Sequence, residues 1–216
     1  MPVPYPEFCQ ERGYVFRIVH RDNVPAILAD GALCRADARS AQYVTIGNPD
    51  LIEKSRTRTV PIAPGGTLED YVRFYFTPRS MMLFNILTGW QGLTKRTPQE
   101  IAILVSSVRR LVAESATFVF TDGHAHLEPT NFYVDPRELR RIDWTILQRS
   151  DFSRSANDPG KSGRYQAELL VHRRVRMSYL LGLACFDEGA KAEYEAMTSA
   201  ANLDLTIRVK PTWYPR

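Results

Sequence analysis

The sequence has 216 residues, 44% hydrophobic and 24% charged, and its 28 Lys and Arg against 24 Asp and Glu give a net charge of +4. These values are typical of one globular domain with its own core. They exclude a wholly disordered chain, a collagen-like chain and two full catalytic domains. The mild positive charge permits a polyanionic partner without requiring one.

The sequence carries no signal for a membrane or for secretion. No apolar run reaches the roughly 18 residues that a membrane helix needs, and the Pro-rich N-terminus lacks the basic stretch and apolar core of a signal peptide. Cys9, Cys34 and Cys185 are odd in number and far apart, which argues against a disulfide framework and fits a reducing compartment. We therefore expect a cytoplasmic protein without membrane contact.

The N-terminal part of the chain is predicted to form a strand, a turn and a helix that ends at a glycine. The β-rich run Tyr14–His20 ends on a histidine. A short helix follows, with Asp22 as its N-cap, Pro25 in its first turn and Gly31 as its end. Residues 35–64 are predicted to be irregular, and a segment of this length in a small domain usually has a function or is mobile.

β-branched and aromatic residues predict six further strands, at 73–76, 101–105, 117–120, 167–171, 179–185 and 205–210. Short helices are predicted after Thr67 and over 135–141, a longer Ala- and Glu-rich helix over 187–201, and a polar loop over 150–163. Because these elements show no regular βαβ repeat, we expect a mixed sheet in an α+β fold, with residues 1–216 forming a single domain.

Several common catalytic designs are not supported. The chain has no Gly-x-Gly-x-x-Gly, P-loop or Gly-x-Ser-x-Gly motif. His124 and His126 lie beside Asp122, but no spaced third ligand follows. A turn with exposed histidines is therefore a better interpretation than a metal site.

Four segments form a pattern that is specific as a set, although each alone is weak. They are IVHRDNVPAIL (18–28) with Gly31, Ile46-Gly47 leading to Arg56, YVRFYFTPRS (71–80) and YQAELLV (165–171). In this order they resemble the DarT family, the DNA ADP-ribosyltransferase toxins of DarT–DarG toxin–antitoxin systems, which are distantly similar to poly(ADP-ribose) polymerases. The resemblance spans residues 14–185 and implies an ADP-ribosyltransferase-like fold with a central mixed, split sheet and short flanking helices.

The resemblance implies an enzyme that consumes NAD as a substrate, needs no metal and attaches one ADP-ribose to a thymidine base in single-stranded DNA. Cleavage of the bond between nicotinamide and ribose passes through an oxocarbenium-like centre, and Glu168 is implied as the carboxylate that stabilises it. Arg56 is implied as the guanidinium that stabilises the thymine anion. The run Lys54-Ser55-Arg56-Thr57-Arg58 leaves Arg58 as the alternative, and we favour Arg56.

The same resemblance places NAD on the first strand and helix and on the aromatic strand. His20 would hydrogen-bond the adenosine ribose, the backbone of Arg21 would hold the carboxamide, and Tyr75 would stack on the nicotinamide ring. From the residues alone, His20 is equally a strand-end histidine bonded to nearby backbone. The remaining implied NAD contacts are Asn23, Leu28 and Arg35, of which Leu28 also fits the core.

The polar segment before Glu168 is expected to choose the nucleic-acid substrate, because it combines cations for phosphates with aromatic rings for unpaired bases. Its alternative is a solvated linker, since Asp151 and Asp158 offset two of its three cations. The DNA-binding residues predicted there are Phe152, Arg154, Lys161, Arg164 and Tyr165.

The family context implies a bacterial toxin that blocks replication and is opposed by a DarG-like macrodomain antitoxin, and we expect a monomer. Two alternatives stay open. One is an ADP-ribosyltransferase of the same fold that modifies protein or RNA. The other is a non-catalytic module for single-stranded nucleic acid, whose binding would depend on salt and not on NAD.

Overall fold

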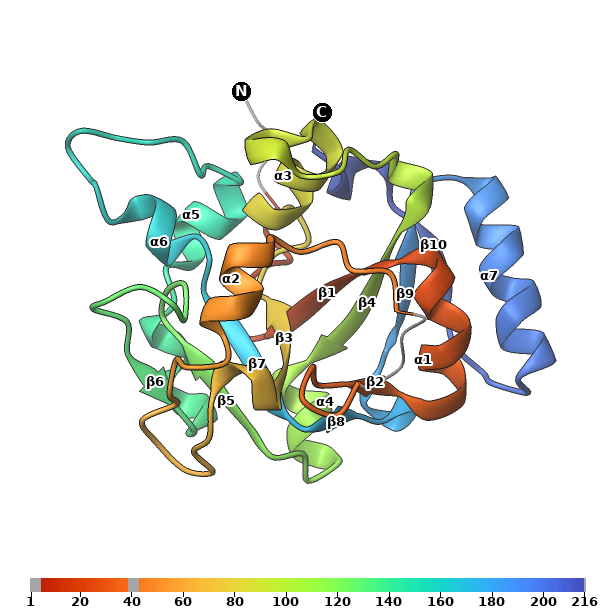
Figure 1. Ribbon diagram of the computed structural model, residues 1–216, viewed down its shortest axis with the longest axis horizontal. Helices are drawn as coiled ribbons and strands as arrows, with labels where there is room; N and C mark the ends of the chain where they lie inside the picture. Colours follow the sequence, from red (N-terminus) through yellow and green to blue (C-terminus); the bar gives the residue numbers. More distant parts are fainter. Residues whose placement is uncertain (1–4, 39–42, 216) are drawn as a thin grey trace.

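The protein is described by a computed structural model over residues 5–38 and 43–215, and a large sheet forms its centre (Figure 1). The strands of this sheet are β1 (Tyr14–His20), β3 (Tyr71–Tyr75), β4 (Ile101–Ser107), β5 (Phe118–Thr121), β6 (Phe132–Tyr133), β7 (Glu168–His172), β9 (Gly182–Cys185) and β10 (Ile207–Val209). Their order is β10-β9-β4-β1-β3-β7-β5-β6. The β9–β10 pair is parallel and the other pairs are antiparallel, which confirms the predicted mixed sheet of an α+β fold.

A small second sheet and seven α-helices surround the main sheet. The second sheet pairs β2 (Ala32–Leu33) with β8 (Arg174–Val175). The helices among the described residues are α1 (Val24–Asp30), α2 (Pro49–Lys54), α3 (Met81–Thr88), α4 (Val108–Ala113), α5 (Trp144–Arg149), α6 (Lys161–Arg164) and α7 (Glu188–Ala200). Of these, α7 is the longest, with 13 residues, and it lies beside β9 and β10 (Figure 1).

The main sheet is split between β1 and β3. β1 is paired with β4 along its whole length, from Tyr14 to His20. β3 is likewise paired along its whole length with β7. Between β1 and β3, however, Phe16–Tyr75 is the single registered pair among the described residues. The two halves of the sheet therefore diverge from this pair, in agreement with the split sheet that the family resemblance implies.

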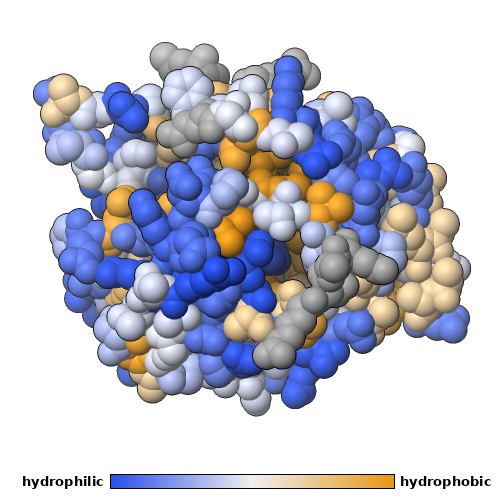
Figure 2. All heavy atoms as spheres, viewed as in Figure 1, coloured by the Kyte–Doolittle hydropathy of each residue, from blue (hydrophilic) through white to orange (hydrophobic). Residues whose placement is uncertain are grey.

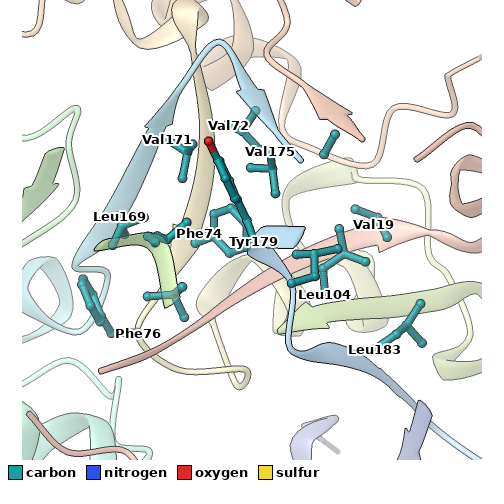
Figure 3. Close-up of a cluster of buried hydrophobic side chains, with 14 of the residues drawn as sticks. Val19, Val72, Phe74, Phe76, Leu104, Leu169, Val171, Val175, Tyr179 and Leu183 are labelled. Carbon is teal, nitrogen blue, oxygen red and sulfur yellow. The ribbon is translucent and has the colours of Figure 1, made fainter. Parts of the chain in front are cut away.

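Apolar residues pack against both faces of the sheet, which explains why its strands read as nearly continuous hydrophobic runs. On β1, Val15 and Val19 face one cluster, whereas Phe16 and Ile18 face the other, as the two-residue repeat of a strand requires. Figure 3 shows the first cluster, where Phe74 lies between Leu169 of β7 and Tyr179. Residues of α1 and α7 join this cluster, and residues of α3 join the second.

Four helices, α2 to α5, were not predicted from the sequence, and they have six to eight residues each. Each begins after a side chain that accepts a hydrogen bond from a backbone N–H of the first turn, at Asn48, Ser80, Ser107 and Asp143. A helix of about two turns is too short for a clear apolar period. The prediction that residues 35–64 are irregular is therefore wrong over α2.

Three boundaries also differ from the predictions. Asn23, not Asp22, precedes α1, because Arg21–Asn23 form a 3-10 turn whose N-cap is His20. The strand predicted from residue 179 begins at Gly182, since the preceding residues form another 3-10 turn. The loop predicted over 150–163 includes the start of α6. Within residues 5–38 and 43–215, no helix is long and apolar enough to cross a membrane.

Candidate active site

A cavity of about 320 Å³ lies where β1 and β3 diverge. Its wall includes Arg17 from β1, Arg73 and Tyr75 from β3, and residues of α1 and α2. In Figure 1 this place lies between α1 and α2, and Figure 2 shows hydrophobic residues beside strongly hydrophilic ones in the middle of the same face. A volume of this size is at the lower end of the range for small-molecule sites, roughly 300–1,000 Å³.

Glu168 is the first residue of β7 and is only 1% exposed. It is registered opposite Tyr75, so both side chains lie on the same face of the sheet, next to the split. Its backbone N–H donates to the Thr121 hydroxyl at 3.1 Å, which fixes the start of the strand. Its Oε2 is buried and has no hydrogen-bond partner within the described part of the chain. The backbone at Glu168 is therefore fixed, and the buried Oε2 of its carboxyl stays free to accept a bond.

Burial dominates the protonation of the groups around this carboxyl. Burial raises the pKa of Glu168 to about 7, although the positive charge of Arg73 acts to lower it. It also raises the pKa of Tyr75 well above its usual value, so that phenol stays neutral. Arg17 donates from Nη1 to the backbone oxygen of Arg73 at 3.0 Å, and burial lowers its pKa to about 10, which still leaves it charged at neutral pH. Two guanidinium groups, those of Arg17 and Arg73, thus lie in the cavity wall with the carboxylate of Glu69, and the pKa of the neighbouring Glu168 is close to neutrality.

The ionisation of Glu168 should make stability depend on pH. Its pKa in the folded state lies above the ordinary 4.5, so the stability it contributes is complete below pH 4.5 and is lost as the pH rises through about 7. Replacing Glu168 by glutamine should leave unfolding nearly unchanged at about pH 4. At about pH 8.5 it should stabilise the protein, by on the order of 3 kcal/mol. Urea unfolding at both pH values checks this, and a difference that does not vary with pH would contradict it.

Three of the predicted NAD-binding residues lie in the cavity wall: Tyr75, Asn23 and Arg35. The amide of Asn23 holds both backbone groups of Val44, accepting from its N–H at 2.8 Å and donating to its oxygen at 2.9 Å. Asn23 thereby positions the segment that closes this side of the cavity. The side chain of Arg35 is exposed, with Nη2 3.5 Å from the Thr45 hydroxyl.

The other three predicted NAD-binding residues lie outside the cavity wall. His20 is 4% exposed, accepts a hydrogen bond from the Asp22 N–H at Nδ1 (3.2 Å) and lies 3.6 Å from Glu100 through Nε2. Arg21 pairs with Glu193 of α7. Leu28 is 5% exposed among the core residues of α1, which favours the packing alternative for this residue.

The structure places neither candidate for the catalytic arginine in the cavity wall. Arg56 is 53% exposed and pairs with Glu53 at 2.8 Å and Glu69 at 3.5 Å. Arg58 donates from Nε to the backbone oxygen of Ala125 at 3.1 Å. The guanidinium that lies closest in sequence and register to the Glu168–Tyr75 pair is instead that of Arg73.

Most of the aromatic and charged side chains predicted to bind DNA have partners within the protein. Tyr165 is 1% exposed and its hydroxyl donates to the backbone oxygen of Arg79 at 2.9 Å, so its ring is buried in this structure and its stacking on unpaired bases stays a prediction. Phe152 packs against that ring, with centroids 5.3 Å apart. Lys161 pairs with Asp151 at 2.9 Å, and Arg164 pairs with Asp158 at 2.6 Å. Arg154 is exposed.

The prediction that His124 and His126 lie exposed in a turn is wrong. His124 is 7% exposed and His126 is half-buried beside Arg73 and Ser55. Burial and the charge of Arg73 lower the pKa of both histidines to about 4, so both are neutral. Over residues 5–38 and 43–215, no three His, Cys, Asp or Glu side chains gather in a way that could hold a metal ion.

The polar residues of the cavity wall that were not predicted as site residues include Arg17, Ser55, Arg73 and His124. Two of them had a signal. Arg17 interrupts the apolar run YVFRIVH and Arg73 interrupts YVRFYF, and a charge inside a buried strand needs a partner or a function. Ser55 had no such signal, because its role depends on contacts with residues distant in the sequence.

The strand arrangement is also found in solved structures. A structure described as Thermus sp. 2.9 DarT in complex with ADP-ribosylated ssDNA is 27% identical and has a TM-score of 0.87, with 100% of both chains covered. The same Thermus protein in complex with NAD+ gives a TM-score of 0.80 at 28% identity, covering 95% of this chain and 98% of the other. The fold is thus that of an ADP-ribosyltransferase.

The sequence comparisons agree with this class. The family model described as "ssDNA thymidine ADP-ribosyltransferase, DarT" matches residues 16–215, and the chain belongs to this family. A DNA ADP-ribosyl transferase of Escherichia coli O127:H6 is 43% identical over 205 residues, which cover 94% of each chain. A fusion of a DNA ADP-ribosyl transferase and a DNA ADP-ribosyl glycohydrolase from Thermosipho africanus is 25% identical, over 93% of this chain and 49% of the fusion.

Proposed function

We propose that this chain is an NAD-consuming enzyme that transfers one ADP-ribose to a thymidine base of single-stranded DNA. The observation that carries the proposal is the buried, partly unbonded Glu168 carboxyl opposite Tyr75, beside the cavity at the split of the sheet. The relatives add the two substrates, because the Thermus protein is described in complexes with NAD+ and with ADP-ribosylated ssDNA.

The reaction exchanges one bond at the C1′ carbon of the nicotinamide ribose. The bond from C1′ to the nicotinamide nitrogen breaks, and its electron pair leaves with nicotinamide. A ring nitrogen of thymine loses its proton to solvent and forms the new bond to C1′. Between these events C1′ carries positive charge, and the Glu168 carboxylate stabilises that charge by accepting a hydrogen bond from the ribose 2′-OH. Tyr75 stacks on the nicotinamide ring as it leaves.

Arg56 is the residue that we propose for the thymine anion, following the order of the family motifs. This role requires its side chain to leave Glu53 and Glu69. Exposed ion pairs of this kind contribute only about 1 kcal/mol or less each, so a DNA ligand can replace them. The exposed Arg154, in the segment before Glu168, is the cation best placed to meet a phosphate.

In this proposal the chain acts as a single-domain, monomeric toxin in the cytoplasm, where the base modification blocks replication. A DarG-like macrodomain antitoxin would remove the modification. The Thermosipho fusion supports that pairing, because it joins a transferase and a glycohydrolase in one protein. The charge of +4 suits a polyanionic substrate.

The proposal predicts a mass increase of one ADP-ribose on thymidine-containing single-stranded oligonucleotides incubated with the purified protein and NAD. Mass spectrometry of a mixed oligonucleotide pool measures it, with thymidine-free oligonucleotides as the control. Hydrolysis of NAD without any oligonucleotide shift would redirect the proposal to protein or RNA acceptors. Untouched NAD with salt-dependent DNA binding would favour a non-catalytic binding module instead.

A further inference from the structure

Arg73 joins three separate segments of the chain at the cavity. Its Nη1 lies 3.2 Å from Nε2 of His126, in the turn after β5, and its Nη2 donates to the hydroxyl of Ser55, directly after α2. Its backbone oxygen accepts the bond from Arg17 of β1. Arg73 lies within the motif YVRFYFTPRS, but none of the roles proposed above is assigned to it.

The shortest contacts in this cluster define the positions of its protons. The Ser55 hydroxyl donates to the backbone oxygen of Leu51 at 2.6 Å, so its oxygen can accept from Arg73. Arginine only donates, so Nε2 of His126 must accept from it and the imidazole proton must lie on Nδ1. This agrees with the neutral state of His126. The guanidinium thus holds two different acceptors through its planar fork.

The cluster lies next to the reaction centre. Arg73 is two residues before Tyr75 on β3, so the two side chains share one face of the strand, and Glu168 is registered opposite Tyr75. Ser55 immediately precedes Arg56 in the chain. The acceptors that Arg73 holds therefore belong to the segment that carries the proposed catalytic arginine and to the turn beyond β5.

We propose that Arg73 is a positioning residue of the transfer reaction, which holds the Ser55–Arg56 segment and the His126 turn in place relative to Glu168. The inference rests on the proposed function and assigns a role to a residue of the same site. A fork that donates to two acceptors fixes them more tightly than a flexible ammonium group would. Misplacement by about 1 Å is enough to cost roughly 100-fold in rate.

The charge of Arg73 gives the proposal a second, independent readout. Arg73 is the charged group that shifts the pKa of Glu168. The other ionisable groups on the elements around Glu168 include Tyr71, Tyr75, Arg17, His124 and His126. Both phenols and both imidazoles are neutral at pH 7, and Arg17 is a cation that donates to the Arg73 backbone. Removal of the Arg73 charge should therefore raise the pKa of Glu168. The acid limb of the pH–rate profile should then move to higher pH.

The test compares R73Q and R73K with wild type and with R137Q, a matched change at an arginine whose side chain is 88% exposed. Steady-state transfer to a thymidine oligonucleotide is measured from about pH 5.5 to 9, with thermal unfolding alongside. For R73Q we expect kcat to fall roughly 10- to 100-fold with KM for NAD nearly unchanged, and the acid limb to move up by about one pH unit. For R73K we expect a lower kcat but an unmoved acid limb, because the charge remains and the fork is lost.

Equal kcat and pH profiles for R73Q, R73K and R137Q would overturn the proposal. So would a loss of activity in R73Q that tracks its unfolding while the profile of the folded fraction is unchanged, because that is the behaviour of a purely structural arginine. A wild-type protein that modifies no DNA would instead refute the proposed function. If that protein still hydrolyses NAD, the pH–rate profile of NAD hydrolysis is compared between wild type and R73Q. A shift of its acid limb in R73Q tests the effect of Arg73 on Glu168 independently of DNA transfer.

Discussion

Replacing Glu168 by glutamine is expected to reduce ADP-ribosyl transfer by at least roughly 100- to 1,000-fold while the protein stays folded. Glutamine has nearly the same shape, but it carries no negative charge to stabilise the positive C1′ centre. The fold should survive, because the backbone N–H of residue 168 keeps its bond to Thr121 and Oε2 has no hydrogen bond to lose in the described structure.

Single-turnover transfer to a thymidine oligonucleotide, measured beside circular dichroism, checks this expectation. Glu188→Gln is the matched control, since its side chain is 79% exposed on α7, away from the cavity wall. Full transfer by folded E168Q protein would remove Glu168 from the mechanism. Retained binding of NAD by E168Q would show that the loss lies in the chemical step, as a role in stabilising the transition state requires.

Replacing Gly31 by alanine is expected to cost at least about 3 kcal/mol of folding free energy, or roughly 6–12 °C in Tm for a chain of this size. Gly31 ends α1 at a φ of +77°, which side chains rarely adopt. An added Cβ would also lie 2.3 Å from the backbone oxygen of Val175. The change would force β2 away from β8, next to the wall of the cavity.

Gly65→Ala is the control that separates the two causes. Its φ of +82° is as unfavourable for alanine, but nothing lies within 4 Å of an added Cβ. We expect it to cost only about 1–2 kcal/mol, and calorimetry of both variants measures the difference. Equal losses for the two variants would show that the backbone angle alone, and not the contact with Val175, explains Gly31.

Much of the fold could be predicted from the sequence because its strongest signals are local. Strand β1 and helix α7 have long, regular patterns with clear ends, and Asp187 caps α7 as expected for a helix start. Helix α3 had no such pattern: Met81-Met82-Leu83-Phe84 is apolar throughout, and its helical state depends on the Ser80 cap and on packing. Register between strands, such as Tyr75 opposite Glu168, is a property of tertiary structure that the sequence does not encode locally.

The candidate site likewise contains residues that could be predicted from the sequence and residues that could not. Tyr75, Asn23 and Arg35 were predicted from motifs and lie in the cavity wall. Arg73 and His126 were not predicted, because their pairing joins β3 to a turn 53 residues away. Tyr165 was assigned to DNA because tyrosine is equally suited to stacking and to burial, and only its environment distinguishes the two. Residue type and order thus predict chemistry, whereas exposure and partners come from the fold.

The divergence of β1 and β3 has a consequence for how the site can vary during evolution. Beyond Phe16–Tyr75 no further pair is registered between the two strands in the described part of the chain, and residues of both facing edges line the cavity, so main-chain groups other than the Arg73 carbonyl, which Arg17 binds, are unpaired along these edges. Main-chain groups are the same whatever side chain a residue carries. A pocket bordered by strand edges can therefore keep its polar lining while most side chains change. This fits a protein that shares 27% identity with its Thermus relative and yet superimposes on it at a TM-score of 0.87.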